Sequence, residues 1–213
     1  MSAVKYRLVL FDVDSTLVTI EGIDVLAGGN PEITKLTEAA MNGEVPVDAV
    51  YAKRLEIIRP ARDVVEALGR LYVASIVDGV EPAFARLRDA GVEIHLVTAG
   101  IAQAIHPLAA HLGIADRAVH AVSMHFDRDG NYVDFDRQSP LTRTGGKEIA
   151  VRDIRARAKG KAAFVGDGVT DLETKPVVDL FIGFGGVHVR SRVRENAAVF
   201  VTDFEAVLSH LIQ

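Results

Sequence analysis

The sequence contains no cysteine among its 213 residues. This absence excludes disulfide bonds, metal sites built from thiolates and catalysis by a cysteine nucleophile. No stretch of the chain approaches the roughly 18 consecutive apolar residues that a membrane-spanning helix needs. The residues before Asp12 also lack the long apolar region of a secretory signal. We therefore expect a cytoplasmic protein without a membrane partner.

A surplus of positive charge is missing too, because 29 acidic residues outnumber 24 basic ones and the formal net charge is −5. This balance argues against a general nucleic-acid surface, while a local basic pocket stays compatible with it. The chain is 49% apolar and 25% charged, which is typical of an ordinary globular protein. Its length fits one sizeable domain, or one domain with a smaller insertion.

Several apolar runs have the length and composition of buried strands, and segments of helical periodicity lie between most of them. The strand-like runs cover residues 6–13, 92–98, 161–167, 179–185 and 197–203. This alternation predicts an α/β fold, a Rossmann-like doubly wound parallel sheet with helices on both faces. Ligands of such sheets bind beyond the carboxyl ends of the strands, where Asp12, Thr98 and Asp167 fall.

Two segments interrupt the alternation. Residues 20–76 contain only helical patterns, and we expect them to form a helical cap inserted after the first strand, over the strand ends. The core domain would then comprise residues 1–19 and 77–213. Residues 119–136 carry an Asp-Gly turn between two strand-like halves, which predicts a small β-hairpin flap.

The stretch LVLFDVDSTLV places two acidic residues, Asp12 and Asp14, at the end of an apolar strand. Alternate residues of a strand point to the same side, so two buried carboxylates would repel each other unless a cation offsets their charge. A carboxylate at this place can accept a phosphoryl group, and its neighbour can act as general acid and base. Mg²⁺ suits such oxygen ligands. The plainer interpretation is a polar strand terminus followed by a turn.

A second acidic pair, Asp167 and Asp171, lies in the stretch FVGDGVTDLE. Thr170 and Glu173 fit a capping box at the start of a helix, which would explain part of this stretch without any ligand. That interpretation leaves Asp167 unexplained. We therefore favour an oxygen cage for Mg²⁺ made of four carboxylates, namely those of Asp12, Asp14, Asp167 and Asp171.

Two further residues are candidate phosphate ligands. Lys147 falls in the first turn of a predicted helix over 145–158, where a cation opposes the helix dipole unless an anion lies nearby. Thr98 offers a hydroxyl group at the end of the second strand. Taken alone, Lys147 fits an exposed surface lysine and Thr98 fits a helix cap. Only their combination with the acidic pairs indicates a site.

The motifs DVDST, VTAG, GGK and GDGVTD, in this order, resemble the signature motifs of the haloacid dehalogenase superfamily of phosphatases. The stretches EGID, KRLEIIRP, TGGKE, VGDGVTDLE and FIGFGG are similar to the phosphoserine phosphatase family in particular, over about residues 8–210. The resemblance implies that Asp12 is the nucleophile and Asp14 the acid and base. It also implies that Asp167 and Asp171 serve the metal, and that Thr98 and Lys147 hold the phosphate.

The expected cap supplies candidates for recognising the rest of a phosphoserine molecule. In a predicted helix over 47–58, Arg54 lies within an apolar stripe, from which an arginine either extends to solvent or pairs with a carboxylate. The resemblance assigns Arg54 to the substrate carboxylate and Glu21 to the ammonium group, with Met41 closing the pocket. The other substrate-binding residues that it implies are Asn42, Thr98, Ala99, Gly100, Lys147 and Thr170.

The chain departs from the family pattern at two places. Thr98, Ala99 and Gly100 stand where the family usually has Ser-Gly-Gly, and Asn42 stands where it usually has glycine. Thr98 keeps the hydroxyl group, so we expect phosphate binding to be retained. The departures bear on the fine choice of substrate.

We therefore expect a Mg²⁺-dependent phosphomonoesterase of serine biosynthesis. It would hydrolyse O-phospho-L-serine through a phospho-aspartyl intermediate, as a monomer or homodimer. Two alternatives stay open. One is a phosphatase or phosphotransferase of the same superfamily that acts on another small phosphomonoester. The other is a phospho-accepting signalling receiver, which would be about half this size and would lack both Asp14 and the insertion.

Overall fold

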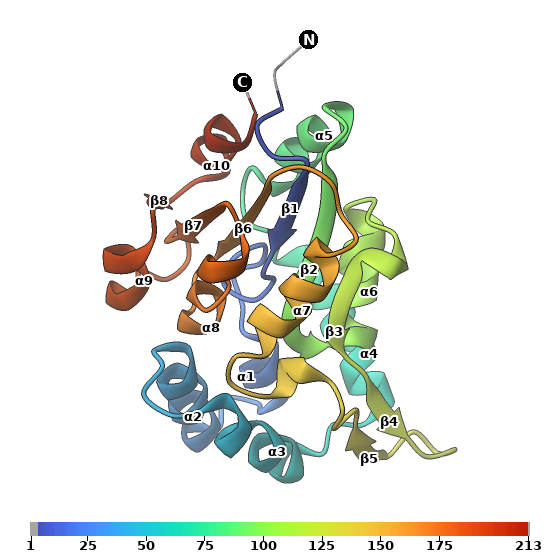
Figure 1. The fold of residues 1–213 in the computed structure, drawn as a ribbon. Coiled ribbons are helices and arrows are strands. Elements are labelled where there is room, and N and C mark those ends of the chain that lie inside the picture. Colours follow the sequence, from blue (N-terminus) through green and yellow to red (C-terminus); the bar gives the residue numbers. More distant parts are fainter. Residues whose placement is uncertain (1–3, 213) are drawn as a thin grey trace.

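The computed structural model describes residues 4–212 and is built around a six-stranded sheet (Figure 1). The strand order is β3-β2-β1-β6-β7-β8, and every neighbouring pair is parallel. The strands are β1 (Leu8–Phe11), β2 (Glu93–Ile101), β3 (Val119–Val122), β6 (Ala162–Gly166), β7 (Leu180–Phe184) and β8 (Val199–Val201). The predicted α/β class with a parallel sheet is confirmed.

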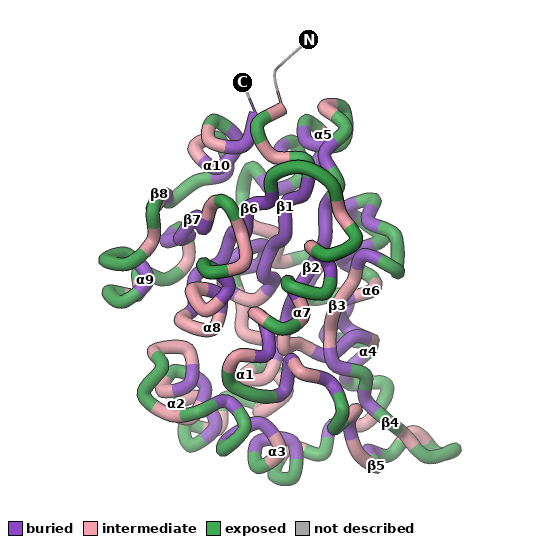
Figure 2. Tube along the Cα trace, viewed as in Figure 1, coloured by how far each residue is buried: buried purple, intermediate pink, exposed green. Residues whose placement is uncertain are grey.

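Helices flank the sheet and bury its central strands. All four residues of β1 are buried, as expected for a parallel strand covered on both faces. Figure 2 shows buried positions concentrated along the strands and exposed ones on the outer sides of the helices. The helices that follow the predicted cap segment in the chain are α5 (Val80–Asp89), α6 (Ala102–His111), α7 (Gly146–Arg155), α8 (Val169–Leu172), α9 (Ser191–Asn196) and α10 (Phe204–Leu211). None of the helices in residues 4–212 is long and apolar enough to cross a membrane.

The segment 20–76 is helical, as the sequence predicts. It forms α1 (Gly22–Leu26), α2 (Pro31–Met41), α3 (Val47–Ile58) and α4 (Arg62–Ala74). Figure 1 shows α2 and α3 beyond the ends of the strands. Helix α4 instead packs along α6 of the core, at the close approach that Gly69 permits. The helices of this segment therefore differ in their attachment to the core, and its division into a separate cap stays a prediction.

The predicted hairpin is present but shorter than expected. It consists of β4 (Met124–Phe126) and β5 (Tyr132–Phe135), paired antiparallel around the Asp-Gly turn. The first part of the predicted span, residues 119–122, is instead β3 at the edge of the main sheet. In the structure these residues pair with β2, so the hairpin keeps only the remainder of the span. Its Phe135 ring packs 5.2 Å from that of Tyr51 on α3.

Three short 3₁₀ helices complete the described secondary structure: η1 (Asp116–Ala118), η2 (Pro140–Thr142) and η3 (Lys175–Val177). The η2 turn leads into α7 and sets its first residue tightly in place. A Cβ atom at Gly146 would fall 1.8 Å from the carbonyl oxygen of Pro140, so only glycine fits there. The N-terminus of α7, which carries Lys147, is thereby positioned by the backbone before it.

Candidate active site

The loop after β1 carries the first acidic residues of the site. The backbone N–H of Asp12 donates to the carbonyl of Val165, which continues the pairing of β1 with β6 by one residue. Ser15 then takes a left-handed backbone conformation with φ of +54°, an uncommon state for a residue other than glycine. Its hydroxyl group donates to Glu21 Oε1 at 2.6 Å. This sharp turn brings Glu21 back toward the end of β1.

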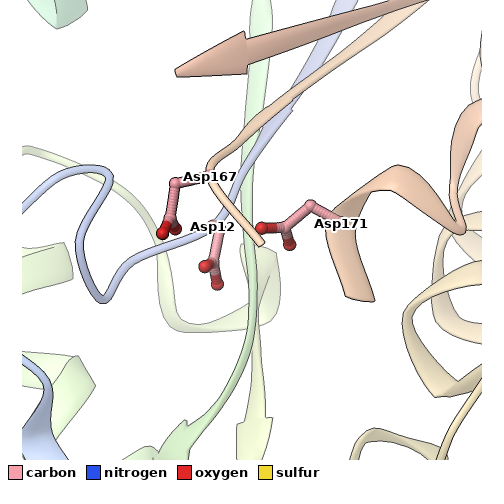
Figure 3. A group of neighbouring side chains, drawn as sticks. All are labelled: Asp12, Asp167 and Asp171. Carbon is pink, nitrogen blue, oxygen red and sulfur yellow. The ribbon is translucent and has the colours of Figure 1, made fainter. Parts of the chain in front are cut away.

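The carboxylates of Asp12, Asp167 and Asp171 converge at the carboxyl ends of β1 and β6 (Figure 3). Each offers an oxygen atom, and these atoms all lie within 4.8 Å of one another. The Asp171 side chain extends from α8 and lies close to the backbone of Gly166. A Cβ atom at Gly166 would fall 2.4 Å from the carboxyl carbon of Asp171. Three buried carboxylate oxygens are a ligand set that fits a hard divalent cation.

Lys147 lies between two of these carboxylates. Its Nζ atom is 2.6 Å from Asp12 Oδ1 and 2.5 Å from Asp171 Oδ1, and the side chain is buried. Burial by itself would lower the pKa of this ammonium group, but the two carboxylates outweigh it and raise the pKa. Burial and Asp171 raise the pKa of Asp12, against the effect of Lys147. An amine held in its charged form beside Asp12 is suited to binding an anion.

Asp14 lies in a different environment from Asp12. Its Oδ1 atom accepts hydrogen bonds from the backbone N–H of Gly22 at 2.8 Å and from the Tyr72 hydroxyl at 2.7 Å. These two donors hold the carboxylate toward α1 and α4. Among the described residues, the metal-type group therefore contains Asp12, Asp167 and Asp171 but not the Asp14 side chain. Burial raises the pKa of Asp14, and the hydrogen bonds from Tyr72 and Gly22 oppose that rise.

The acidic residues around α8 do not form the capping box that the sequence allows. Gly168 is the N-cap of α8, and its backbone N–H donates to Asp171 Oδ2 at 2.8 Å. Glu173 points elsewhere and accepts from the N–H of Gly145. The interpretation with Thr170 as the cap was therefore wrong. Asp171 caps the helix with one oxygen and contacts Lys147 with the other.

Thr98 is buried inside β2 rather than at its end. The strand continues to Ile101, which is the N-cap of α6, so Thr98 does not cap that helix. Its Oγ1 atom accepts a hydrogen bond from the N–H of Gly100 at 3.0 Å. Because Leu96 pairs with the last residue of β1, Thr98 lies beyond the point where β1 ends. Its hydroxyl proton is thereby available to a ligand in front of Asp12.

A cavity beside Asp12 collects most of the predicted site residues. Its wall is formed by the strand ends on one side and by helices α1 to α4 on the other. The predicted residues that line it are Asp12, Asp14, Glu21, Met41, Arg54, Thr98, Ala99, Gly100, Lys147 and Thr170. Asp167 and Asp171 lie behind Asp12, and Asn42 is not part of the lining. Asn42 is the C-cap of α2 and accepts from Arg190 at 3.4 Å.

The cap end of the cavity contains a buried cation. Arg54 is only 7% exposed, so it does not extend to solvent. Its Nη1 atom donates to the hydroxyl oxygen of Thr37 at 3.1 Å, and its Nε atom is buried without a hydrogen-bond partner among the described residues. The nearby Tyr51 hydroxyl donates to the carbonyl of Ala99 at 2.8 Å. A buried, unpaired donor costs free energy that an acceptor on a ligand would recover.

Two residues of the site were missed by the sequence interpretation. Arg190 donates from Nε to Asp167 Oδ2 at 3.0 Å, and its Nη2 atom is 3.8 Å from Glu21 Oε1. Its position after the FIGFGG motif, beyond β7, was a usable signal. Tyr72 lies on a helix far from every motif, and no sequence signal marked it.

Burial raises the pKa of Glu21 well above its usual range, and the carboxylates of Asp14 and Asp167 add to the rise.

Residues 9–174 match the family model described as haloacid dehalogenase-like hydrolase. The chain belongs to this family. It is 35% identical over 207 residues to the phosphoserine phosphatase of Mus musculus, which covers 95% of this chain and 92% of that protein. Solved structures also share its fold. A phosphoserine phosphohydrolase-like protein from Francisella tularensis superposes with a TM-score of 0.88 at 24% identity, covering 96% of this chain and 99% of that one. The structure of a phospho-aspartyl intermediate analogue of phosphoserine phosphatase superposes with a TM-score of 0.83 at 24% identity. The match covers 97% of this chain and 99% of that one.

Proposed function

We propose that this protein is a Mg²⁺-dependent phosphomonoesterase that hydrolyses O-phospho-L-serine to L-serine and phosphate. The observation that carries the proposal is the cavity with complementary groups at both ends. One end has Asp12 and the Lys147 ammonium, and the other has Arg54 with an unpaired N–H. Phosphoserine carries a phosphate at one end and a carboxylate with an ammonium group at the other. The relatives named phosphoserine phosphatase support the same substrate.

The carboxylates of Asp12, Asp167 and Asp171 would hold the metal ion, because their oxygens lie within 4.8 Å of one another and suit a hard cation. When bound, Mg²⁺ would offset negative charge on these carboxylates and on the phosphate. Arg190 and the Thr16 hydroxyl orient Asp167 from behind, at 3.0 and 3.1 Å. Such outer contacts fix the direction in which a ligating carboxylate points.

In the first step, a carboxylate oxygen of Asp12 attacks the phosphorus atom. A bond forms between Asp12 and phosphorus, and the bond from phosphorus to the serine oxygen breaks. Protonated Asp14 gives its proton to the departing oxygen, so serine leaves as the neutral alcohol. Lys147 and the Thr98 hydroxyl donate to the phosphoryl oxygens, where negative charge must be stabilised during transfer.

In the second step, water attacks the phosphorus atom of the phospho-aspartyl group. Asp14, now ionised, takes a proton from this water, and the bond between Asp12 and phosphorus breaks. Phosphate is released, and Asp14 regains the proton that the next cycle needs. Burial favours the protonated form of Asp14, while its two hydrogen-bond donors favour the ionised form, so both states are accessible to one residue.

Recognition of the serine portion falls to the cap end. Arg54 would pair with the carboxylate, using the Nε proton that has no partner among the described residues. Glu21 would accept from the ammonium group, and its contact with Ser15 holds it toward the cavity. Met41 lies against the backbone of Gly168 in the core, so it closes the cavity at the α2 side.

The test is phosphate release from three substrates of similar size. Phosphoserine is compared with phosphoethanolamine, which lacks the carboxylate, and with 3-phosphoglycerate, which lacks the ammonium group. We expect phosphoserine to have the highest kcat/KM by at least tenfold, and we expect EDTA to abolish release. Equal rates on all three would contradict the substrate. Phosphate transfer to an added alcohol without release would favour a phosphotransferase of the same family.

The remaining expectations are part of the proposal. We propose that the enzyme acts in the cytoplasm in serine biosynthesis, without a nucleic-acid partner, and as a monomer or homodimer. Light scattering on the purified protein tests the oligomeric state, and serine auxotrophy after deletion of the gene tests the cellular role.

A further inference from the structure

We propose that Tyr72 is a positioning residue for Asp14, which it orients so that one fixed carboxylate oxygen exchanges protons with the substrate. This inference rests on the proposed function, since it gives Tyr72 a task in the acid and base steps. A hydrogen bond that no motif explains connects the two residues. The Tyr72 hydroxyl, from the last turns of α4, donates to Asp14 Oδ1 at 2.7 Å.

The hydrogen bonds of Asp14 are unevenly divided between its two oxygens. The Oδ1 atom accepts hydrogen bonds from both the Tyr72 hydroxyl and the backbone N–H of Gly22. These two hydrogen bonds occupy both of its lone pairs. Oδ2 instead faces the strand that carries Thr98. A Cβ atom built at Gly100 would lie 3.3 Å from Asp14 Oδ2 and 3.2 Å from Thr98 Oγ1. The oxygen that has no donor within residues 4–212 is therefore the one beside the expected phosphate position.

The phenol is held rigidly enough to orient a carboxylate. Tyr72 is 1% exposed, and α4 packs against α6 of the core. At Gly69, three residues before Tyr72, a Cβ atom would lie 3.0 Å from Pro107 on α6, so the two helices approach closely there. Tyr72 is thus attached to the core, although it comes from the segment between the first two strands.

Gly22 fits the same arrangement from the opposite side. A Cβ atom at Gly22 would fall 2.0 Å from the Tyr72 hydroxyl oxygen, a separation that no side chain tolerates. The absence of a side chain lets the Gly22 N–H and the phenol reach the same oxygen of Asp14.

The consequence for catalysis concerns the leaving group. With Oδ1 held by two donors, the acidic proton resides on Oδ2, next to the oxygen that must leave. Without the phenol, the carboxyl group is free to rotate, and the proton is in place for a smaller share of the time. The loss should matter for an alkyl alcohol such as serine, which leaves only when protonated. It should matter little for a nitrophenol, which is stable as an anion.

The experiment measures phosphoenzyme formation in a single turnover, with Tyr72→Phe and two substrates. We expect the rate with phosphoserine to fall about 5- to 20-fold, since one oriented hydrogen bond is lost from a proton-transfer step. With 4-nitrophenyl phosphate, we expect a change of less than about twofold. Tyr51→Phe is the matched control, because it removes another cavity phenol that bonds the carbonyl of Ala99 rather than Asp14. It should leave the ratio of the two rates unchanged.

A second variant covers the case in which Tyr72→Phe perturbs folding. Gly22→Ala pushes the phenol away from Asp14 while keeping the tyrosine, and it should show the same selective loss with phosphoserine. In the double variant with Tyr72→Phe, the fold-loss in rate with phosphoserine should be smaller than the product of the two single fold-losses. Equal slowing of both substrates by either variant would make Tyr72 structural and overturn the inference, and so would no slowing at all. Failure of the proposed function shows differently, as absent turnover of both substrates by the wild-type enzyme with Mg²⁺.

Discussion

The two ends of the cavity solve the problem of buried charge in opposite ways. At the phosphoryl end, Lys147 contacts Asp12 and Asp171 directly, so the cation already has acidic partners. At the cap end, Arg54 is equally buried but contacts a neutral hydroxyl, and its Nε atom has no partner among the described residues. At the first end the cation is paired within the core, and the carboxylates that outnumber it would be offset by a metal ion. The second end requires an acceptor from outside, which is where a substrate would be recognised.

This difference follows from the elements that build each end. The phosphoryl end consists of loops after parallel strands and of the N-terminus of α7, which meet at one edge of the sheet. The cap end consists mainly of side chains from α1, α2 and α3, which belong to the segment between β1 and β2. We therefore expect variants at the first end to affect every substrate, and variants at the second to affect the choice among substrates.

The largest expected effect is that of Asp12→Asn. The amide is close in size to the carboxylate but is a poor nucleophile, so the protein should stay folded and lose activity on all phosphomonoesters. We expect a loss on the order of a thousandfold or more in kcat. Phosphate release and circular dichroism measure the two properties. Substantial turnover by this variant would contradict a covalent intermediate on Asp12.

Arg54→Ala should separate the two ends. Losing one charge-assisted contact in a buried pocket costs about 1.5–3 kcal/mol, or roughly ten- to a hundredfold in kcat/KM. The loss should appear with phosphoserine and be nearly absent with phosphoethanolamine, which has no carboxylate. Lys147→Met is the matched control, because it removes a buried cation from the phosphoryl end and should harm both substrates alike. If Arg54→Ala also slowed both alike, Arg54 would be structural.

The same division governs how much of the site the sequence predicted. Asp12, Lys147, Asp167 and Asp171 follow from local motifs, because a parallel sheet brings strand ends and helix N-termini together wherever they occur in the chain. The sequence could not show that the Asp14 side chain turns away from the other carboxylates. That orientation depends on Tyr72, which is 58 residues away.

The cap end was less accessible to sequence reasoning for a related reason. The periodicity of 47–58 placed Arg54 in an apolar stripe, and the structure confirms its burial. Its partner Thr37 comes from another helix whose packing the periodicity does not specify. The same limit applies to residues 119–122, whose composition suits a hairpin strand and a sheet edge equally well. Pairing with β2 decided between the two.

A third prediction concerns the stability of the metal-free protein. Burial and Asp171 raise the pKa of Asp167 from 3.8 to about 6. Between these values the folded chain binds more protons than the unfolded one, so this residue's contribution to stability falls as the pH rises through that window. Asp167→Asn removes the charge and should therefore raise the melting temperature at pH 7.5 by several degrees, corresponding to about 1–3 kcal/mol.

The pH dependence of that gain is what identifies its cause. At pH 5 the wild-type Asp167 is already largely protonated in the folded chain, so the advantage of the variant should shrink or vanish. Adding Mg²⁺ at pH 7.5 should stabilise the wild type but not the variant. Asp89→Asn, at an exposed position on α5, is the control and should show neither effect. A gain that is equal at both pH values would mean that crowding of carboxylates is not the cause.

The smallest effect should come from Asn42→Gly, which restores the residue usual in the family. Asn42 is outside the cavity lining, has ordinary helical backbone angles with φ of −82°, and reaches Arg190 only at 3.4 Å. The neighbouring chain is held independently, because Arg192 donates to the backbone carbonyls of Asn42 and Gly43. We therefore expect less than about a threefold change in kcat/KM for phosphoserine, since two long side-chain hydrogen bonds, to Arg190 and Glu44, are worth little. The ratio of phosphoserine to phosphoethanolamine activity should not change. Ala99→Gly is the comparison, because Ala99 lines the cavity and should shift that ratio more. A tenfold shift from Asn42→Gly would instead mean that the end of α2 contacts the bound substrate.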